Sequence, residues 1–152
     1  PVAAAALEKF TPVKRRLEVK SNRHGVTVYD DFAHHPTAIG KTLNALKQSK
    51  RHQRILVVLE FGSYTMRTGV HKDDMAQALA GADIAYVLNP SEFSLSDMAK
   101  NWQFPYTVLP TTDAIVEAVA DNVQVGDAVL VMSNRGFDNI HQRLVGRIDT
   151  KF

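Results

Sequence analysis

Short apolar runs alternate along this chain with segments whose apolar residues recur every three or four positions. The continuous apolar runs have the length of strands and are typical of parallel strands covered on both faces. They fall at residues 55–59, 84–88 and 128–132. Shorter patterns predict three further strands, at residues 17–20, 26–32 and 106–109.

Helical spacing fills most of the intervals between these strands. Ile39, Leu43 and Leu46 form one apolar stripe, and Pro36 fits the first turn of that helix because its missing N–H is not needed there. Thr112-Asp113 is expected to cap a later helix. The remaining helices are predicted at residues 72–80, at residues 95–102 and around Ile140, Leu144 and Ile148.

The alternation of strand, loop and helix predicts the fold class. It indicates an α/β, Rossmann-like domain with a mostly parallel, doubly wound sheet of about six strands and helices on both faces. The first two strands are separated only by a turn at residues 21–25, in which Gly25 can adopt positive φ. We therefore expect these two strands to form a hairpin.

Composition narrows the class of protein. The 152 residues suit one domain, and the absence of cysteine excludes a disulfide framework. Lys plus Arg is 18 and Asp plus Glu is 16, and the charges are interspersed, so no nucleic-acid partner is expected. No apolar run approaches the roughly 18 residues of a membrane span. We expect a cytoplasmic protein with no membrane partner, in which residues 1–12 end an interdomain linker and residues 13–152 form the domain.

Polar residues gather where the second predicted strand ends. Asp30 and Asp31 are followed closely by His34 and His35. Ligands of open α/β sheets bind at the carboxyl ends of strands, so this loop is a candidate site. Neighbouring strand residues point to opposite faces, so we expect no dedicated metal site. Asp31 and His34 are the functional candidates, with Asp31 suited to sugar hydroxyls or to an ion near phosphate.

Other polar residues give weaker signals. The Arg15-Arg16 pair offers forked donors to phosphate, although such pairs are commonly only solvated. Ser133-Asn134 follows a buried strand and suits an anion or carboxylate site. Arg67 lies in a polar loop and suits an anionic substrate. Asp30 is expected to cap the loop, and Trp102 is expected to anchor a short helix. Surface or packing roles are expected for the remaining histidines, His24, His52, His71 and His141.

Four segments, taken together and in order, resemble the carboxy-terminal domain of the Mur ligases. Residues 14–18 (KRRLE) and 29–37 (YDDFAHHPT) match the family in general. Residues 63–74 (SYTMRTGVHKDD) and 131–142 (VMSNRGFDNIHQ) resemble the members that add a ready-made peptide. The resemblance covers nearly the whole chain.

The resemblance implies an ATP-dependent ligase of peptidoglycan recycling. Such an enzyme joins UDP-N-acetylmuramate to the murein tripeptide L-alanyl-γ-D-glutamyl-meso-diaminopimelate, with Mg²⁺ bridging the phosphates. It also implies two further domains, one that binds the UDP sugar and one that carries the ATP P-loop. We find no P-loop with its Gly-Lys-Ser/Thr ending here. The chain alone is therefore predicted to be inactive and to act with other domains of the same polypeptide.

Residue roles carry over by position in the motifs. Arg16 and Asp31 are expected to bind the nucleotide, and Asp31, His34 and His35 to lie at the reaction centre. Substrate binding is implied for Arg67, Ser133 and Asn134. Where relatives carry Pro-Arg, this chain has Phe61-Gly62, which leaves Arg67 or Arg135 for the peptide carboxylate.

Two alternatives remain open on the sequence. One is the domain of the relative that adds L-alanine to UDP-N-acetylmuramate. The other is a binding module for nucleotides or peptides that has no catalytic activity.

Overall fold

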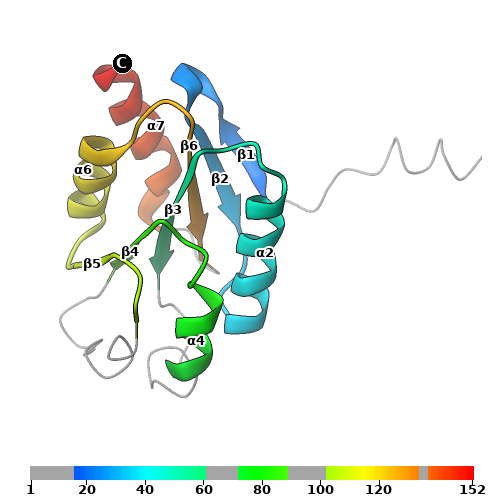
Figure 1. The fold of residues 1–152 in the computed structure, drawn as a ribbon. Helices are drawn as coiled ribbons and strands as arrows, with labels where there is room; N and C mark the ends of the chain where they lie inside the picture. Colours follow the sequence, from blue (N-terminus) through cyan, green and yellow to red (C-terminus); the bar gives the residue numbers. More distant parts are fainter. Residues whose placement is uncertain (1–15, 61–71, 89–101, 134–136) are drawn as a thin grey trace, which may run out of the picture.

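One six-stranded sheet organises the computed structural model, which describes residues 16–60, 72–88, 102–133 and 137–152. The strand order is β1-β2-β6-β3-β4-β5 (Figure 1). Strand β1 pairs antiparallel with β2, and the other neighbours pair in parallel. The strands are β1 (Glu18–Ser21), β2 (Thr27–Asp31), β3 (Arg54–Glu60), β4 (Ile84–Leu88), β5 (Tyr106–Leu109) and β6 (Asp127–Met132).

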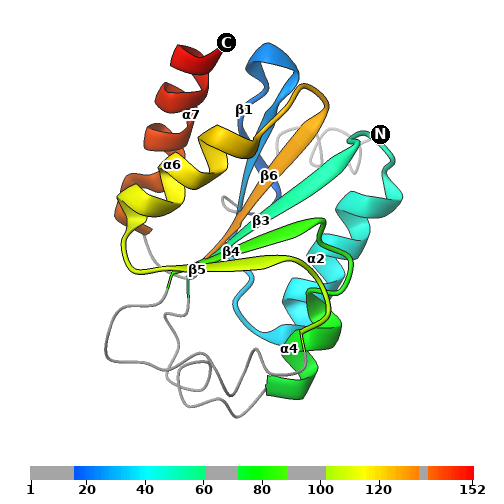
Figure 2. The ribbon, with the colours of Figure 1, turned by 60° about the vertical axis from the view of Figure 1, so that its left-hand side comes forward.

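Helices cover both faces of the sheet. The α-helices are α2 (Pro36–Gln48), α4 (Lys72–Ala78), α6 (Thr112–Asn122) and α7 (Ile140–Lys151), with 3-10 turns η1 (Arg23–Gly25) and η2 (Phe137–Asn139). Helices α2 and α4 lie on one face, and α6 and α7 on the other (Figures 1 and 2). Helix α2 connects β2 to β3, and α6 connects β5 to β6 in the opposite direction across the sheet. Because both crossovers are right-handed, the two helices lie on opposite faces. Within the described ranges, no helix is long and apolar enough to cross a membrane.

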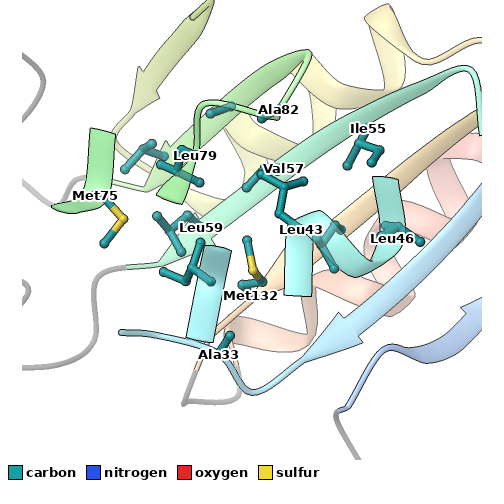
Figure 3. Close-up of a cluster of buried hydrophobic side chains, with 14 of the residues drawn as sticks. Ala33, Leu43, Leu46, Ile55, Val57, Leu59, Met75, Leu79, Ala82 and Met132 are labelled. Carbon is teal, nitrogen blue, oxygen red and sulfur yellow. The ribbon is translucent and has the colours of Figure 1, made fainter. Parts of the chain in front are cut away.

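Each face of the sheet buries its own core. Ile55, Val57 and Leu59 of β3 pack under α2 and α4, together with Met75 and Leu79 (Figure 3). The alternate side chains of the same strand, Leu56 and Val58, pack under α6 and α7. This burial on both faces explains why the strand reads as a continuous apolar run.

The predicted elements are confirmed where the structure describes them, with small corrections to their ends. The strand predicted at residues 26–32 runs from Thr27 to Asp31, because its pairing with β6 ends where β6 ends, at Met132. The helix predicted at residues 72–80 ends at Ala78. The cap of α6 is Thr111, whose side chain accepts a hydrogen bond from the Ala114 N–H, and Thr112 lies inside the helix.

The short helix predicted at residues 95–102 falls outside the described residues, apart from Trp102. The Trp102 side chain is buried and stacks on Phe104, with ring centroids 5.1 Å apart. An anchoring role for Trp102 in that short helix stays a prediction.

The amino ends of the central strands are fixed by a partly buried ion pair. Arg54 of β3 donates two hydrogen bonds to the carboxylate of Asp127 on β6, at 3.0 and 2.6 Å. Asp127 also accepts from the Gln124 N–H. The hydrogen bond to Asp127 raises the pKa of Arg54 above its ordinary value. This edge of the sheet is therefore held together by the chain's own groups.

Candidate functional site

The carboxyl ends of β2, β6 and β3 meet at one edge of the sheet. Asp31 lies beside Met132 in the register of β2 and β6, and Leu59 of β3 lies beside Met132 from the other side. The Ser133 N–H donates to the Asp31 carbonyl at 3.1 Å. The Ser133 hydroxyl donates to Glu60 Oε1 at 2.7 Å. The three strand ends are therefore fastened to one another directly behind the loop that follows β2.

An open hollow of about 460 Å³ lies beside that loop. It brings together Arg16, Asp31, His34 and His35, the residues expected to bind the nucleotide or to lie at the reaction centre. Arg16 reaches this place because the β1–β2 hairpin returns the chain to the carboxyl end of β2. The other lining residues are Leu17, Phe32, Ala33, Ala38, Lys41, Thr42 and Ala45.

Asp31 is the most firmly held of these side chains. Its Oδ1 accepts hydrogen bonds from the Ala33 N–H at 2.8 Å and from the Thr42 hydroxyl at 3.3 Å. Its Oδ2 accepts from the Leu17 N–H at 2.9 Å. The residue is only 6% exposed. Its carboxylate therefore accepts three hydrogen bonds from within the chain, two from backbone N–H groups and one from a side chain. A contact between Asp31 and a nucleotide stays a prediction.

The two imidazoles lie at the start of α2. His34 Nδ1 is 3.2 Å from the Phe32 carbonyl oxygen, so in this contact Nδ1 carries the proton and donates. In the neutral ring, Nε2 is then the acceptor. His35 is the N-cap residue of α2, and its ring lies 4.6 Å from that of His34. Helix α2 thus begins beside a proton acceptor and an exposed aromatic ring, Phe32.

The charges around the hollow suit an anion. Arg16 and Lys41 both line it, and the positive end of the α2 dipole lies at the same place. A guanidinium and an ammonium beside the N–H groups of the first helical turn form a donor set that fits phosphate or carboxylate oxygens. In the parts of the chain that the structure describes, no group of three His, Asp or Glu side chains could hold a metal ion.

The tripeptide Gly40-Lys41-Thr42 carries the letters of a P-loop ending, but not the rest of the motif. It lies inside α2, and His35 stands where the first glycine of a P-loop would be required. The tripeptide therefore forms no phosphate loop, although Lys41 and Thr42 line the hollow from the helix.

The residues expected to bind the peptide are placed only in part. Ser133 has a fully buried side chain that donates to Glu60, so it supports the strand ends. A contact between Ser133 and a peptide stays a prediction. Arg67, Asn134 and Arg135 lie outside the described residues, as does the Phe61-Gly62 departure.

The structural role expected for Asp30 is supported by its place on the opposite face from Asp31. Its Oδ1 lies 3.1 Å from Nε2 of His141 on α7, and both side chains are largely buried. His52 and His24 also have polar neighbours, namely the Tyr29 hydroxyl at 2.8 Å and Asp149 at 2.9 Å. Sequence gave no signal for these pairs, because the partners lie far apart along the chain.

Comparison with known families gives one match that covers most of the chain. The sequence profile described as "Mur ligase, glutamate ligase domain" matches residues 15–135. A UDP-N-acetylmuramate–L-alanyl-γ-D-glutamyl-meso-2,6-diaminoheptandioate ligase of Haemophilus influenzae is 44% identical over 98% of this chain. A UDP-N-acetylmuramate–L-alanine ligase of Streptomyces griseus is 33% identical over 95%. The chain spans 34% and 33% of the lengths of these two relatives, about a third of each.

Solved structures agree with this match. A murein peptide ligase of Psychrobacter arcticus superposes with a TM-score of 0.83 at 36% identity, over 96% of this chain and 32% of that one. A domain from a putative UDP-N-acetylmuramate:L-alanyl-γ-D-glutamyl-meso-diaminopimelate ligase of Haemophilus ducreyi superposes with a TM-score of 0.74, also at 36% identity. The alignment covers 90% of this chain and 100% of that domain, which was solved by itself.

Proposed function

Because this chain belongs to the Mur ligase family, we propose that it is the C-terminal substrate-binding domain of an ATP-dependent ligase. The ligase would join UDP-N-acetylmuramate to the tripeptide L-alanyl-γ-D-glutamyl-meso-diaminopimelate in peptidoglycan recycling. The observation that carries this proposal is the 44% identity, over almost the entire chain, to a relative named for that reaction. Since the chain spans only about a third of that relative, catalysis belongs to the whole ligase, and we expect the chain alone to be inactive.

The chemistry of the hollow supports this proposal. In an ATP-dependent ligation, the γ-phosphoryl group passes to a carboxylate oxygen and ADP leaves. The amine then attacks the acyl carbon, phosphate departs with the C–O bonding electrons, and the nitrogen loses a proton. Arg16 and Lys41 would stabilise the phosphate charge. His34, with Nε2 as acceptor, is the candidate for receiving the proton, and His35 would flank the same reacting groups.

The cofactors and surroundings belong to the same proposal. ATP would be the phosphoryl donor, and Mg²⁺ would offset the negative charge of its phosphates. We expect Mg²⁺ to be bound mainly by the ATP-binding domain of the ligase rather than by this chain. The proposed partners are UDP-N-acetylmuramate, the murein tripeptide and other domains of the same polypeptide. We place the reaction in the cytoplasm, where ATP and UDP-activated sugars are available.

A second candidate is the reaction of the L-alanine-adding relative. The 33% identity to the Streptomyces griseus enzyme over 95% of the chain favours it. The higher identity to the tripeptide ligase, 44% over 98%, favours the first candidate.

Site variants of the complete product of the gene that encodes this chain test the proposal. We expect His34→Ala to lower the rate of ATP-dependent ligation about a hundredfold or more, the typical contribution of a proton-transfer group. We expect Asp31→Ala to lower it as well, because the variant loses the anchor of the loop. Asp113→Asn is the matched control, since Asp113 is exposed and pairs with Arg143 on the opposite face. Unchanged turnover in both site variants would show that the loop after β2 takes no part in the reaction.

A further inference from the structure

Leu17 has an unusual backbone conformation at the point where the chain reaches the sheet. Its φ is +44°, in the left-handed region, one residue before β1 begins. This region is unfavourable for leucine, because the Cβ atom crowds the following carbonyl oxygen. Such a conformation persists only where the surrounding structure holds it. The contacts of Leu17 should therefore show what holds this bend.

The contact that holds the bend is with Asp31. The Leu17 N–H donates to Asp31 Oδ2 at 2.9 Å, and the leucine side chain packs against the core beneath α2. A hydrogen bond to a carboxylate is stronger than one to a neutral acceptor. Ala33 and Thr42 bind the other carboxylate oxygen, so the acceptor itself cannot turn freely. Asp31 is thus a rigid anchor for the bend at Leu17.

The bend has a consequence for the adjacent residue. Arg16 directly precedes Leu17 and lines the hollow beside His34 and His35. The direction in which the chain leaves Leu17 decides on which side of the loop Arg16 lies. We infer that Asp31 is a positioning residue that holds the bend at Leu17 and thereby directs the Arg16 guanidinium into the hollow. This inference deepens the proposed function, and only the ATP measurements below depend on that function.

Amide hydrogen exchange in the chain itself tests the anchor. The Haemophilus ducreyi domain was solved without its neighbouring domains, so this fold forms independently of them. Asp31→Asn leaves one oxygen for Ala33 and Thr42 and turns an N–H donor toward Leu17. We expect the Leu17 amide to exchange at least about tenfold faster in this variant, as for the loss of one bond to a charged acceptor.

Thr42→Val is the matched control, because it removes a different hydrogen bond from the same carboxylate. Leu17 should stay protected in this control. An unchanged rate at both Leu17 and Ala33 in Asp31→Asn would overturn the inference. If the asparagine oxygen turns toward Leu17 instead, the Ala33 amide is the one that exchanges faster. In that case the Leu17→Pro variant tests the positioning role.

Leu17→Pro removes the donor without altering Asp31, and proline cannot adopt positive φ. In the complete gene product, we expect this variant to raise the KM for ATP about tenfold, with a smaller change in kcat. Arg16→Met should raise the same KM, and the double variant should show no further increase, because both changes act through one guanidinium. A wild-type KM in Leu17→Pro, or additive effects in the double variant, would contradict the positioning role. If no ligation occurs at all, the proposed function fails, while Leu17 exchange still decides the role of Asp31.

Discussion

At the scale of single residues, the structure gives several polar side chains a partner that is distant along the chain. Glu60 accepts a hydrogen bond from the Ser133 hydroxyl, and Lys41 lines the hollow from the second turn of α2. Sequence could identify Asp31, His34 and His35, because these lie within one short loop. It could not show that Glu60 pairs with Ser133 or that Lys41 lines the hollow, because both depend on how β3, β6 and α2 are arranged in space.

His52 gives a prediction at this scale. Burial and the nearby Arg51 lower the pKa of His52 below its ordinary value of 6.5, and its Nε2 contacts the Tyr29 hydroxyl. Above pH 6.5, both the folded and the unfolded states carry the neutral ring. As the pH falls through 6.5 toward the lower folded-state pKa, the unfolded state takes up the proton more readily. We therefore expect the free energy of unfolding to decrease over this range.

The measurement for His52 is the NMR titration of its ring protons. A midpoint below 6.5 is expected, and a midpoint at or above 6.5 would contradict the environment described here. His52→Gln provides the control for stability, because it should remove this part of the decrease at acidic pH.

At the scale of elements, most strands and helices could be predicted, since each has its own apolar pattern. The hairpin of β1 and β2 was also accessible, because its strands are separated only by a short turn. The position of β6 between β2 and β3 could not be predicted, because it depends on which long crossover returns across the sheet. The cap of α6 was misplaced by one residue because Thr111 and Thr112 carry the same side chain, and only backbone geometry separates them.

The turn η2 gives a prediction at this scale. Phe137, Asp138 and Asn139 all have positive φ, at 51°, 52° and 56°. Asparagine tolerates this region better than most residues with a side chain, because its short polar side chain can form local hydrogen bonds. Asn139 is exposed and makes no side-chain cap hydrogen bond to α7. We expect Asn139→Ala to lower the free energy of unfolding by about 1 kcal/mol through backbone strain alone.

Urea unfolding of this variant provides the measurement, with Asn139→Gly as its control. Glycine adopts positive φ without crowding, so the control should stay within about 0.5 kcal/mol of the wild type. Equal losses in both variants would show that the asparagine side chain, rather than the backbone conformation, stabilises the turn.

At the scale of the whole molecule, the amino ends and the carboxyl ends of the strands differ in structure. The edge with the amino ends of β3 and β6 is fixed by Arg54 and Asp127. The edge with the carboxyl ends of β2, β3 and β6 carries the hollow, with cations and imidazoles around it. We expect the remaining parts of a ligase to meet the domain at this second edge, because the hollow lies there. The hollow would then form one side of a site that closes only in the whole enzyme.

The choice of acceptor tests the central claim most directly. The complete gene product would receive ATP, Mg²⁺ and UDP-N-acetylmuramate, with either the murein tripeptide or free L-alanine, and ligated product would be followed over time. We predict ATP-dependent ligation with a higher kcat/KM for the tripeptide than for L-alanine. A preference for L-alanine would assign the chain to the second candidate, and no ligation with either acceptor would contradict its role in a ligase.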